Sequence, residues 1–307
     1  MYPIKAGNGT FKVIWRLENF SYATQKDGES LPSPTFVLDT PLKTKWHLEV
    51  YPRGKTDSRF ISCYLKREDH DECPAAIVMS CQYSILDKYG WHHYFVQIDN
   101  ETIGHRNIVG VNQFVNRSEI FQYKDIFLPQ DTLKVCFRVW DIQLSRSVQC
   151  EMHTLFGIEK RSFLWTIDNF RQRQLSGQWQ TVIPSTSDRP IELKMIFATK
   201  SDSEYYKRAK IGIKCNSECS IFLVCEIFSV DMEGKSQLLA SDDHFFWKKE
   251  FWALPPFTEV SQLFISENLF QNDGTLLLRC VITLSDGVKL NYIVSSICDE
   301  YFPEFGY

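Results

Sequence analysis

The chain has 307 residues, a length that suits about two domains of roughly 150 residues each. Hydrophobic residues make up 44% and charged residues 23%, the balance of an ordinary globular protein, and 23 Phe, 13 Tyr and 8 Trp favour strands over helices. The formal net charge is −4 with both signs interspersed, which excludes nucleic acid as a partner, because phosphate-backbone binding needs a concentrated basic surface.

The beginning of the chain carries no targeting signal. Residues 1–10 lack the apolar core of a signal peptide, and no apolar run approaches the roughly 20 residues that cross a bilayer. The ten cysteines are irregularly spaced, and several lie in apolar runs where a free thiol behaves as a small hydrophobe. We therefore expect reduced cysteines, no membrane association and a location in the nucleus or cytoplasm.

Strand patterns follow one another along the chain. Trp46, Leu48 and Val50 alternate with His47 and Glu49, as in a strand with one buried face. Residues 133–139 alternate in the same way, and 220–230 are almost continuously apolar, as in a strand buried on both faces. Gly-containing turn signals separate such runs at 52–54, 88–90, 233–234 and 272–274. Short strands at this spacing predict antiparallel sandwiches.

The chain also repeats itself. Its opening aromatic motif occurs twice, at an offset of 150 residues: Trp15, Asn19 and Phe20, then Trp165, Asn169 and Phe170. The blocks that begin at Phe114 and Thr132 recur at Phe257 and Thr275, at an offset of 143 residues. Because the matches keep their order, we expect two copies of one all-β domain. The predicted boundaries are 9–143 for the first copy, 144–157 for a linker, 158–290 for the second copy and 291–307 for a C-terminal tail.

Four motifs in the first copy carry a family resemblance. Residues 15–20 read Trp-Arg-Leu-Glu-Asn-Phe, and residues 45–54 read Lys-Trp-His-Leu-Glu-Val-Tyr-Pro-Arg-Gly. Residues 83–87 and 128–135 add Tyr-Ser-Ile-Leu-Asp and Leu-Pro-Gln-Asp-Thr-Leu-Lys-Val. In this order they resemble the MATH (TRAF-C-like) domain of the speckle-type POZ protein group. The second copy keeps the opening motif but lacks the Lys-Trp strand, so it is the more divergent of the two.

This resemblance implies a fold and a function. The fold is two tandem antiparallel eight-stranded β-sandwiches, each with a shallow groove for short peptide segments of partner proteins. In the family such a domain is the substrate-recognition part of a cullin ubiquitin ligase adaptor, and a BTB/POZ domain docks the cullin. Only about 17 residues follow Leu290, far fewer than the roughly 100 of a further domain, so we expect no cullin binding by this chain.

Two other binding roles stay open. One is a TRAF-like scaffold or receptor-tail adaptor, although no heptad run for a trimerising coiled coil precedes Phe11. The other is a decoy that holds substrates without recruiting a ligase.

The resemblance also assigns candidate groove residues. They are Tyr64, Cys81, Val109 and Val111 in the first copy and Phe246, Trp252 and Leu254 in the second. Interface energy concentrates in Trp, Tyr and Arg, so Tyr64 and Trp252 are the expected anchors. The alternative for Trp252 is burial between the sheets.

The sequence gives no sign of an enzyme, a cofactor or a metal. Cys215, Cys219 and Cys225 have gaps of three and five residues and no histidine close in sequence, a poor match to tight zinc-binding pairs. No nucleophile elbow, phosphate loop, HExxH or dinucleotide motif is present. We therefore predict a protein-binding module without catalytic residues.

Overall fold

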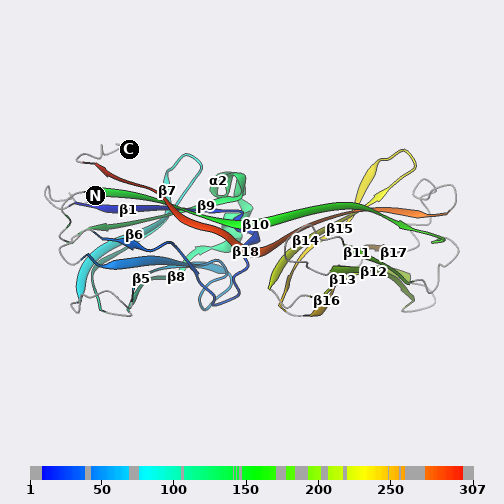
Figure 1. The fold of residues 1–307 in the computed structure, drawn as a ribbon, viewed down its shortest axis with the longest axis horizontal. Helices are drawn as coiled ribbons and strands as arrows, with labels where there is room; N and C mark the ends of the chain where they lie inside the picture. The colour runs from blue at the N-terminus through cyan, green and yellow to red at the C-terminus, as the bar shows by residue number, and fades with distance from the viewer. Residues whose placement is uncertain are drawn as a thin grey trace. The chain divides into compact units, whose positions relative to one another are not determined.

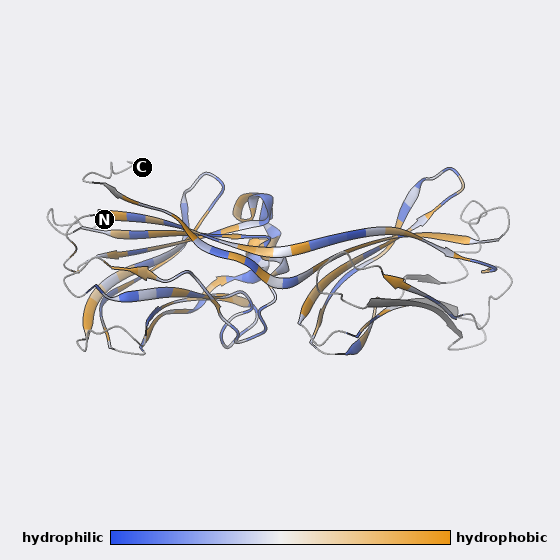
Figure 2. Ribbon diagram, in the orientation of Figure 1, coloured by the Kyte–Doolittle hydropathy of each residue, from blue (hydrophilic) through white to orange (hydrophobic). Residues whose placement is uncertain are grey.

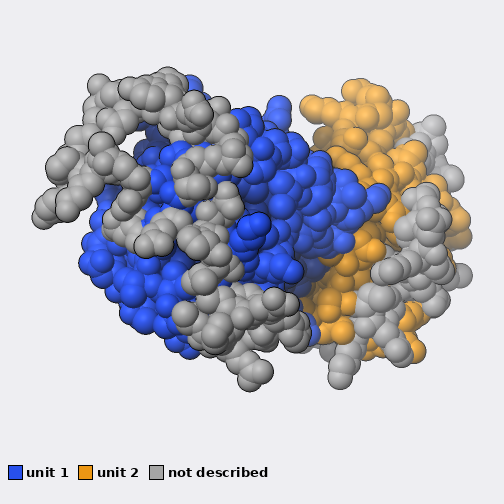
Figure 3. All heavy atoms as spheres, turned by 60° about the vertical axis from the view of Figure 1, so that its left-hand side comes forward, with its two compact units in different colours: residues 1–157, 288–307 blue, residues 158–287 orange. Residues whose placement is uncertain are grey.

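The computed structural model of the chain is built from strands, and its helices are short (Figure 1). It describes residues 9–299 except for 39–42, 69–75, 105–106, 141, 143, 145–146, 171–177, 184–192, 202–206, 217–219, 248, 256 and 260–273. No helix within these residues is long and apolar enough to cross a membrane. The chain divides into unit 1, Met1–Gly157 with Val288–Tyr307, and unit 2, Ile158–Gly287 (Figure 3).

The described residues of unit 1 form nine strands and four short helical segments before its last two strands. The strands are β1 Phe11–Glu18, β2 Leu31–Pro32, β3 Phe36–Val37, β4 Lys45–Tyr51, β5 Phe60–Arg67, β6 Ile77–Leu86, β7 His92–Ile103, β8 Ile108–Asn116 and β9 Thr132–Trp140. The helical segments are η1 Phe20–Tyr22, α1 Arg117–Gln122, α2 Lys124–Phe127 and η2 Pro129–Asp131.

Period-2 burial explains why these segments form strands. In β1, Val13, Trp15 and Leu17 are fully buried, and the residues between them reach solvent. Along β9, which pairs antiparallel with β1, Val135 lies opposite Trp15. Apolar and polar bands alternate along the ribbons of both units (Figure 2). The repeated aromatic residues Trp15, Phe20, Trp165 and Phe170 are all buried, as is Trp46 of the predicted strand.

Two sheets enclose the core of unit 1. One has the order β18-β10-β1-β9-β6-β7, and the other has the order β2-β4-β5-β8, with β3 also paired to β4. Inward-facing residues from both sheets form one hydrophobic cluster. The strands β7 and β8, which end the two sheets, contact each other. Unit 1 is therefore an all-β, sandwich-like body.

Strand β10, Ser147–Ile167, includes most of the segment predicted as a linker. Its first half runs parallel to β1, with Phe11 opposite Val148 and Trp15 opposite Met152. Cys150, Met152 and Phe156 are buried in the unit 1 core. The segment is therefore an added strand of unit 1. Its alternation was missed because the buried position 154 is a threonine and the outward position 155 is a leucine, which interrupts the apolar pattern.

Strand β18, Leu276–Asp299, includes the start of the predicted tail. The Thr154 hydroxyl donates to Asn291 Oδ1 at 2.7 Å and accepts from Trp15 Nε1 at 2.8 Å. Asn291 Nδ2 donates to the Pro32 carbonyl at 3.2 Å, and Tyr292 Oη lies 2.9 Å from His153 Nδ1. Residues 288–299 are thus bound into unit 1.

The described strands of unit 2 repeat the order seen in unit 1. They are β11 Gln178–Ile183, β12 Leu193–Ser201, β13 Lys207–Cys215, β14 Ile221–Val230, β15 Ser236–Phe246, β16 Glu250–Ala253 and β17 Phe257–Glu259, with the adjoining parts of β10 and β18. One sheet has the order β15-β14-β18-β10, and the other has the order β11-β12-β13-β16, with β17 paired to β13. A second hydrophobic cluster fills this unit.

Two sequence repeats have the same backbone geometry in both units. Asn19 and Asn169 have positive φ values of 58° and 56°, a region in which asparagine is enriched among non-glycine residues. The turns after β6 and β14 are equivalent: Asp87 Oδ1 accepts from Tyr89 N and Trp91 N, and Asp231 Oδ1 accepts from Glu233 N and Lys235 N. The repeats therefore mark corresponding positions in the two units.

Candidate functional site

The free edge of β8 is the starting point of the site. Among the described residues this strand ends the β2-β4-β5-β8 sheet, so the polar backbone groups on its outer side pair with no described strand, although β7 contacts β8. Its partner β5 places Tyr64 opposite Gly110 and Cys63 opposite Val111. An edge of this kind is the structural requirement for pairing with an added peptide strand.

Gly110 leaves the space in which the Tyr64 ring lies against β8. A Cβ atom at residue 110 would lie 2.6 Å from Tyr64 Cα and 2.7 Å from Tyr64 Cδ1, and closer still to the Cys63 carbonyl oxygen. Because residue 110 has no side chain, the tyrosine ring lies directly against the β8 backbone. The ring is half-buried, and its burial raises the pKa of its hydroxyl. An aromatic face thus adjoins the edge strand.

Tyr51 and Lys55 complete the surroundings of Tyr64. The Tyr51 ring meets Tyr64 edge to face, with centroids 5.6 Å apart. Lys55 Nζ lies 4.3 Å from the centre of the Tyr64 ring, within cation–π range. The result is a patch of aromatic and cationic groups, which we call the Tyr64 patch: Tyr51, Lys55, Tyr64 and Gly110.

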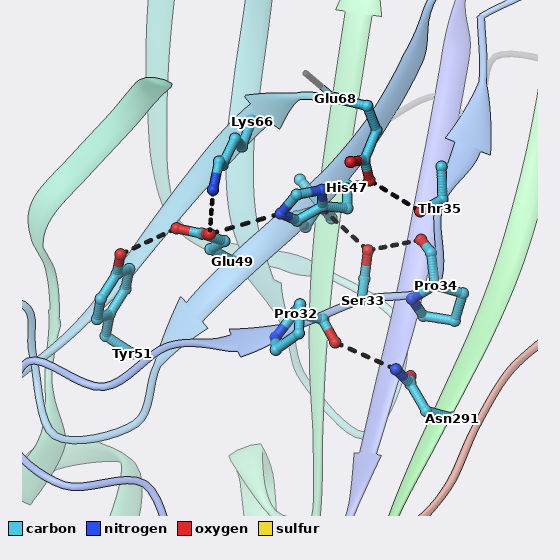
Figure 4. Close-up of polar contacts among 11 residues, drawn as sticks. Pro32, Ser33, Pro34, Thr35, His47, Glu49, Tyr51, Lys66, Glu68 and Asn291 are labelled. Carbon is cyan, nitrogen blue, oxygen red and sulfur yellow. Dashed lines mark hydrogen bonds and ion pairs between the residues drawn. The ribbon is translucent and has the colours of Figure 1, made fainter. Parts of the chain in front are cut away.

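A buried ionic network supports this patch from β4 (Figure 4). Glu49 accepts a hydrogen bond from Tyr51 Oη at 2.9 Å and lies 3.4 Å from His47 Nε2 and 3.5 Å from Lys66 Nζ. His47 Nδ1 lies 2.8 Å from Glu68 Oε1. His47, Glu49 and Tyr51 belong to the outward row of β4, yet they are only 6–9% exposed. The network therefore fixes the Tyr51 ring beside Tyr64.

The charges in the network shift one another's pKa values. The hydrogen bond from His47 lowers the pKa of Glu49 to about 2, aided by Tyr51 and Lys66. Glu49, with Glu68, raises the pKa of His47 above its usual value, against the effect of burial. Burial and the Glu49 carboxylate raise the pKa of Tyr51 to about 12. At neutral pH Glu49 is thus ionised and Tyr51 is a neutral hydrogen-bond donor.

The predicted groove residues of unit 1 fall into two groups that differ in exposure to solvent. Tyr64 and Val111 are half-buried and retain access to solvent. Cys81 is fully buried and Val109 is 6% exposed, both within the core, so the assignment of these two residues to a groove surface is corrected. The pKa of the Cys81 thiol rises to about 12, chiefly because of burial. The sequence could not show that Cys81 and Val109 face inward, because the pairing of a strand with its neighbouring strands decides which of its two rows faces the core.

The predicted residues of unit 2 also lie inside. Phe246, Trp252 and Leu254 are 0%, 8% and 2% exposed and belong to the unit 2 core, where the Trp252 ring stacks on His244 at 5.2 Å. Trp252 is therefore a core residue, which agrees with the alternative prediction that it is buried between the sheets.

The exposed aromatic residue on β16 is Phe251. It is 56% exposed, and a Cβ atom at residue 212 would collide with its ring. In both units an aromatic ring thus lies over a glycine of the neighbouring strand, but the ring and the glycine do not lie on corresponding strands. In unit 1 the ring is on β5 and the glycine on the edge strand, whereas in unit 2 Gly212 is on β13 and the ring on the edge strand β16. Tyr64 lies directly opposite Gly110, whereas Phe251 lies opposite Lys214 and reaches Gly212 diagonally, so the two arrangements are not related by the same strand pairing.

Neither a metal site nor a disulfide is seen in the part of the chain that the structure describes. Within it, no group of three or more His, Cys, Asp or Glu side chains has a metal-binding arrangement. Seven of the described cysteines are buried: Cys63, Cys81, Cys136, Cys150, Cys215, Cys225 and Cys280. Cys219, a member of the weak zinc pattern, lies outside the described residues.

Comparisons with known proteins match a part of unit 1. Residues 12–139 match the family model described as MATH domain. TD and POZ domain-containing protein 3 of Mus musculus is 27% identical over 135 residues, which cover 42% of this chain and 36% of that protein. TD and POZ domain-containing protein 1 of Mus musculus is 25% identical over 136 residues, with the same coverage. The match thus spans little more than a third of the length of these relatives.

One solved structure covers most of the chain but resembles it poorly. Its title is "Structural basis for the promiscuous specificity of the carbohydrate-binding modules from the beta-sandwich super family". It covers 89% of this chain and 95% of its own, at 8% identity and a TM-score of 0.15. A likeness this low carries no argument about fold or function.

Proposed function

We propose that unit 1 binds short extended segments of partner proteins along the edge of β8, with Tyr64 as the anchor. The observation that carries this proposal is the half-buried Tyr64 ring, which lies over Gly110 beside a strand edge that pairs with no other strand in the described part of the chain. Backbone pairing on such an edge supplies affinity, and side-chain pockets next to it supply selectivity. The MATH domain match at residues 12–139 supports a protein-interaction role for the same residues.

Chemistry of the Tyr64 patch indicates the kind of segment. The tyrosine ring, with Tyr51 against its side, offers apolar contact to an aliphatic or aromatic residue. Lys55 beside the ring adds positive charge, which favours a polar or acidic residue next to the apolar one. The proposed ligand is therefore an extended segment with an apolar residue flanked by polar ones.

A role in protein degradation is the wider form of this proposal. The relatives of this chain carry a POZ domain according to their names, and in such proteins we infer that the MATH part selects substrates. By analogy, unit 1 would act as the substrate-recognition part of a cullin ubiquitin ligase adaptor in the nucleus or cytoplasm. Binding without recruitment of a ligase, as a decoy, is the alternative.

We extend the proposal to unit 2, as a divergent second sandwich of the same MATH-like kind. The matching strand order of the two units and the equivalent turns at Asp87 and Asp231 support this relation. Phe251 takes the place of Tyr64 as the exposed aromatic residue, because Trp252 lies in the core. Peptides that bind unit 2 should lose affinity in Phe251→Ala and keep it in Tyr64→Ala.

The test of the main proposal uses peptides selected by phage display on the intact chain. A peptide that binds unit 1 should lose at least about 1–2 kcal/mol of binding free energy in Tyr64→Ala, as an anchor residue does. Tyr89→Ala is the matched control, because Tyr89 is 73% exposed on the turn after β6, in the other sheet. Thermal melting must be unchanged in both variants. Equal affinity of the two variants for every selected peptide would refute Tyr64 as the anchor.

A further inference from the structure

The outward face of the other sheet in unit 1 carries opposed positive charges. In the antiparallel pairing of β1 and β9, Lys12 lies opposite Arg138 and Arg16 lies opposite Lys134. All four belong to the outward rows, since the residues on either side of them are buried. Like charges directly opposite one another on two strands destabilise a sheet. Their presence here therefore calls for a compensating negative charge.

The described residues supply only part of that charge. Arg16 pairs with Glu151 at 3.8 Å. For Lys12, Lys134 and Arg138, no ion pair with a carboxylate occurs within the described ranges. The chain as a whole has a net charge of −4, so this basic face is a local feature and not a consequence of composition. Two uncompensated cations thus face each other at the Lys12–Arg138 position.

His92 extends the group to a third strand. Its Nδ1 lies 2.7 Å from Ser84 Oγ on β6, and Ser84 lies opposite Cys136 of β9. Although Ser84 and Cys136 belong to outward rows, they are 1% and 0% exposed, so longer neighbouring side chains lie over them. The charges of Lys12 and Arg138 act on both the Cys136 thiol and the His92 ring. Lys12 and Arg138 thus face each other across β1 and β9, and His92 contacts Ser84, which lies opposite Cys136 two residues before Arg138. We call Lys12, Arg138 and His92 the Arg138 site.

We propose that the Arg138 site binds the phosphate group of a phosphorylated serine or threonine on a partner protein. A phosphoryl group carries about −1.5 to −2 charges at neutral pH, which matches the two uncompensated cations better than the single charge of a carboxylate. Arg138 can hold two phosphate oxygens at once, and Lys12 and His92 can donate to the third. The site lies on the opposite sheet from the Tyr64 patch and does not depend on the function proposed for that patch.

Fluorescent degenerate nine-residue peptides provide the test, with phosphoserine, serine or glutamate fixed at the centre. The intact chain should bind the phosphoserine set in a saturable, salt-sensitive way, and at least about tenfold more tightly than the serine and glutamate sets. Lys12→Gln with Arg138→Gln should weaken that binding at least about tenfold. The variant Arg138→Lys, which keeps the charge, should lose less. Equal binding of the three peptide sets would overturn the proposal.

The matched control removes two other exposed cations, with Lys45→Gln and Lys160→Gln. Neither residue forms an ion pair with another described residue, so the control changes net charge equally and should leave phosphopeptide affinity within about twofold. An equal loss in the control would show a diffuse charge effect and refute a discrete site. Because like-charge repulsion is relieved, the Lys12 and Arg138 double variant should melt no lower than the wild type.

A second readout follows His92 by NMR. Partial burial and the positive charges of Arg138 and Lys12, with His93, lower the pKa of His92 to about 4. A bound phosphate would favour the protonated ring and raise this pKa. An unchanged His92 titration at saturating phosphopeptide would place the phosphate elsewhere and overturn the assignment.

Discussion

Gly110→Ala is the substitution that tests the seat of Tyr64 most simply. The added methyl group would lie 2.6 Å from Tyr64 Cα and still closer to the Cys63 carbonyl, so it would collide with the β5 backbone and not with the end of a flexible side chain. The strands β5 and β8 must then separate. Overpacking of this kind typically costs about 1–3 kcal/mol of unfolding free energy. We expect a lower melting temperature, by about 2–4 °C for each kcal/mol in a unit of this size.

Gly104→Ala is the matched control. A Cβ atom at residue 104 would meet only Asn107 Nδ2, at 3.7 Å, so this variant should melt within about 1 °C of the wild type. Urea denaturation followed through the amide signals of β8 separates unit 1 from unit 2. Gly110→Ala should also weaken peptides that depend on Tyr64. Equal stability of the two variants would show that the Tyr64 ring does not lie against the β8 backbone.

Three further predictions concern the network, the added strand and the second core. The contribution of the His47–Glu49 network to the stability of unit 1 should be largest between about pH 4.5 and 6.5, because the raised pKa of His47 gives stability that is lost as pH rises through it, and the Glu49 pKa of about 2 gives stability that is lost as pH falls towards it. Glu49→Gln should flatten this profile in urea titrations, and an unaltered profile would contradict the network. Asn291→Ala should lower the unfolding free energy of unit 1 by about 1–3 kcal/mol, because it leaves the buried Thr154 hydroxyl without its acceptor. If the loss is no greater than in the control Ser296→Ala, at an exposed residue, then residues 288–299 do not pack on unit 1. Trp165→Ala should cost unit 2 about 3–5 kcal/mol, whereas Leu164→Ala, at a neighbour that is 61% exposed, should cost under about 1 kcal/mol, and similar losses would place Trp165 outside the core.

The sequence predicted the strands of unit 1 well because their two faces differ in polarity. Val13, Trp15 and Leu17 alternate with polar residues, and burial follows that alternation. The repeated asparagines at 19 and 169 occupy the same backbone conformation, which explains why they recur with the aromatic residues around them. Local pattern was therefore sufficient for the all-β class and for the core aromatics.

Long-range pairing was beyond the sequence pattern. Asn291 and Thr154 are 137 residues apart, and nothing in their local context predicts that they share a hydrogen bond. The predicted linker and tail were therefore found to contain strands of unit 1.

The same limit applies to the candidate site. The run Phe251-Trp252 alternates in burial, but which of the two faces inward depends on the pairing of β16 with β13. Tyr64 was predicted as an anchor, whereas the supporting roles of Tyr51, Lys55 and Glu49 follow only from the distances among them.

Chemical-shift mapping tests the central claim most directly. The intact chain, labelled with 15N, is titrated with a peptide selected for binding to it, and the amide signals of both units are followed. The account predicts that the largest changes occur along residues 108–116 of β8 and at Tyr64, with protection of β8 amides from hydrogen exchange as the added strand pairs. Saturable binding with changes confined to other strands, and none along β8, would contradict it.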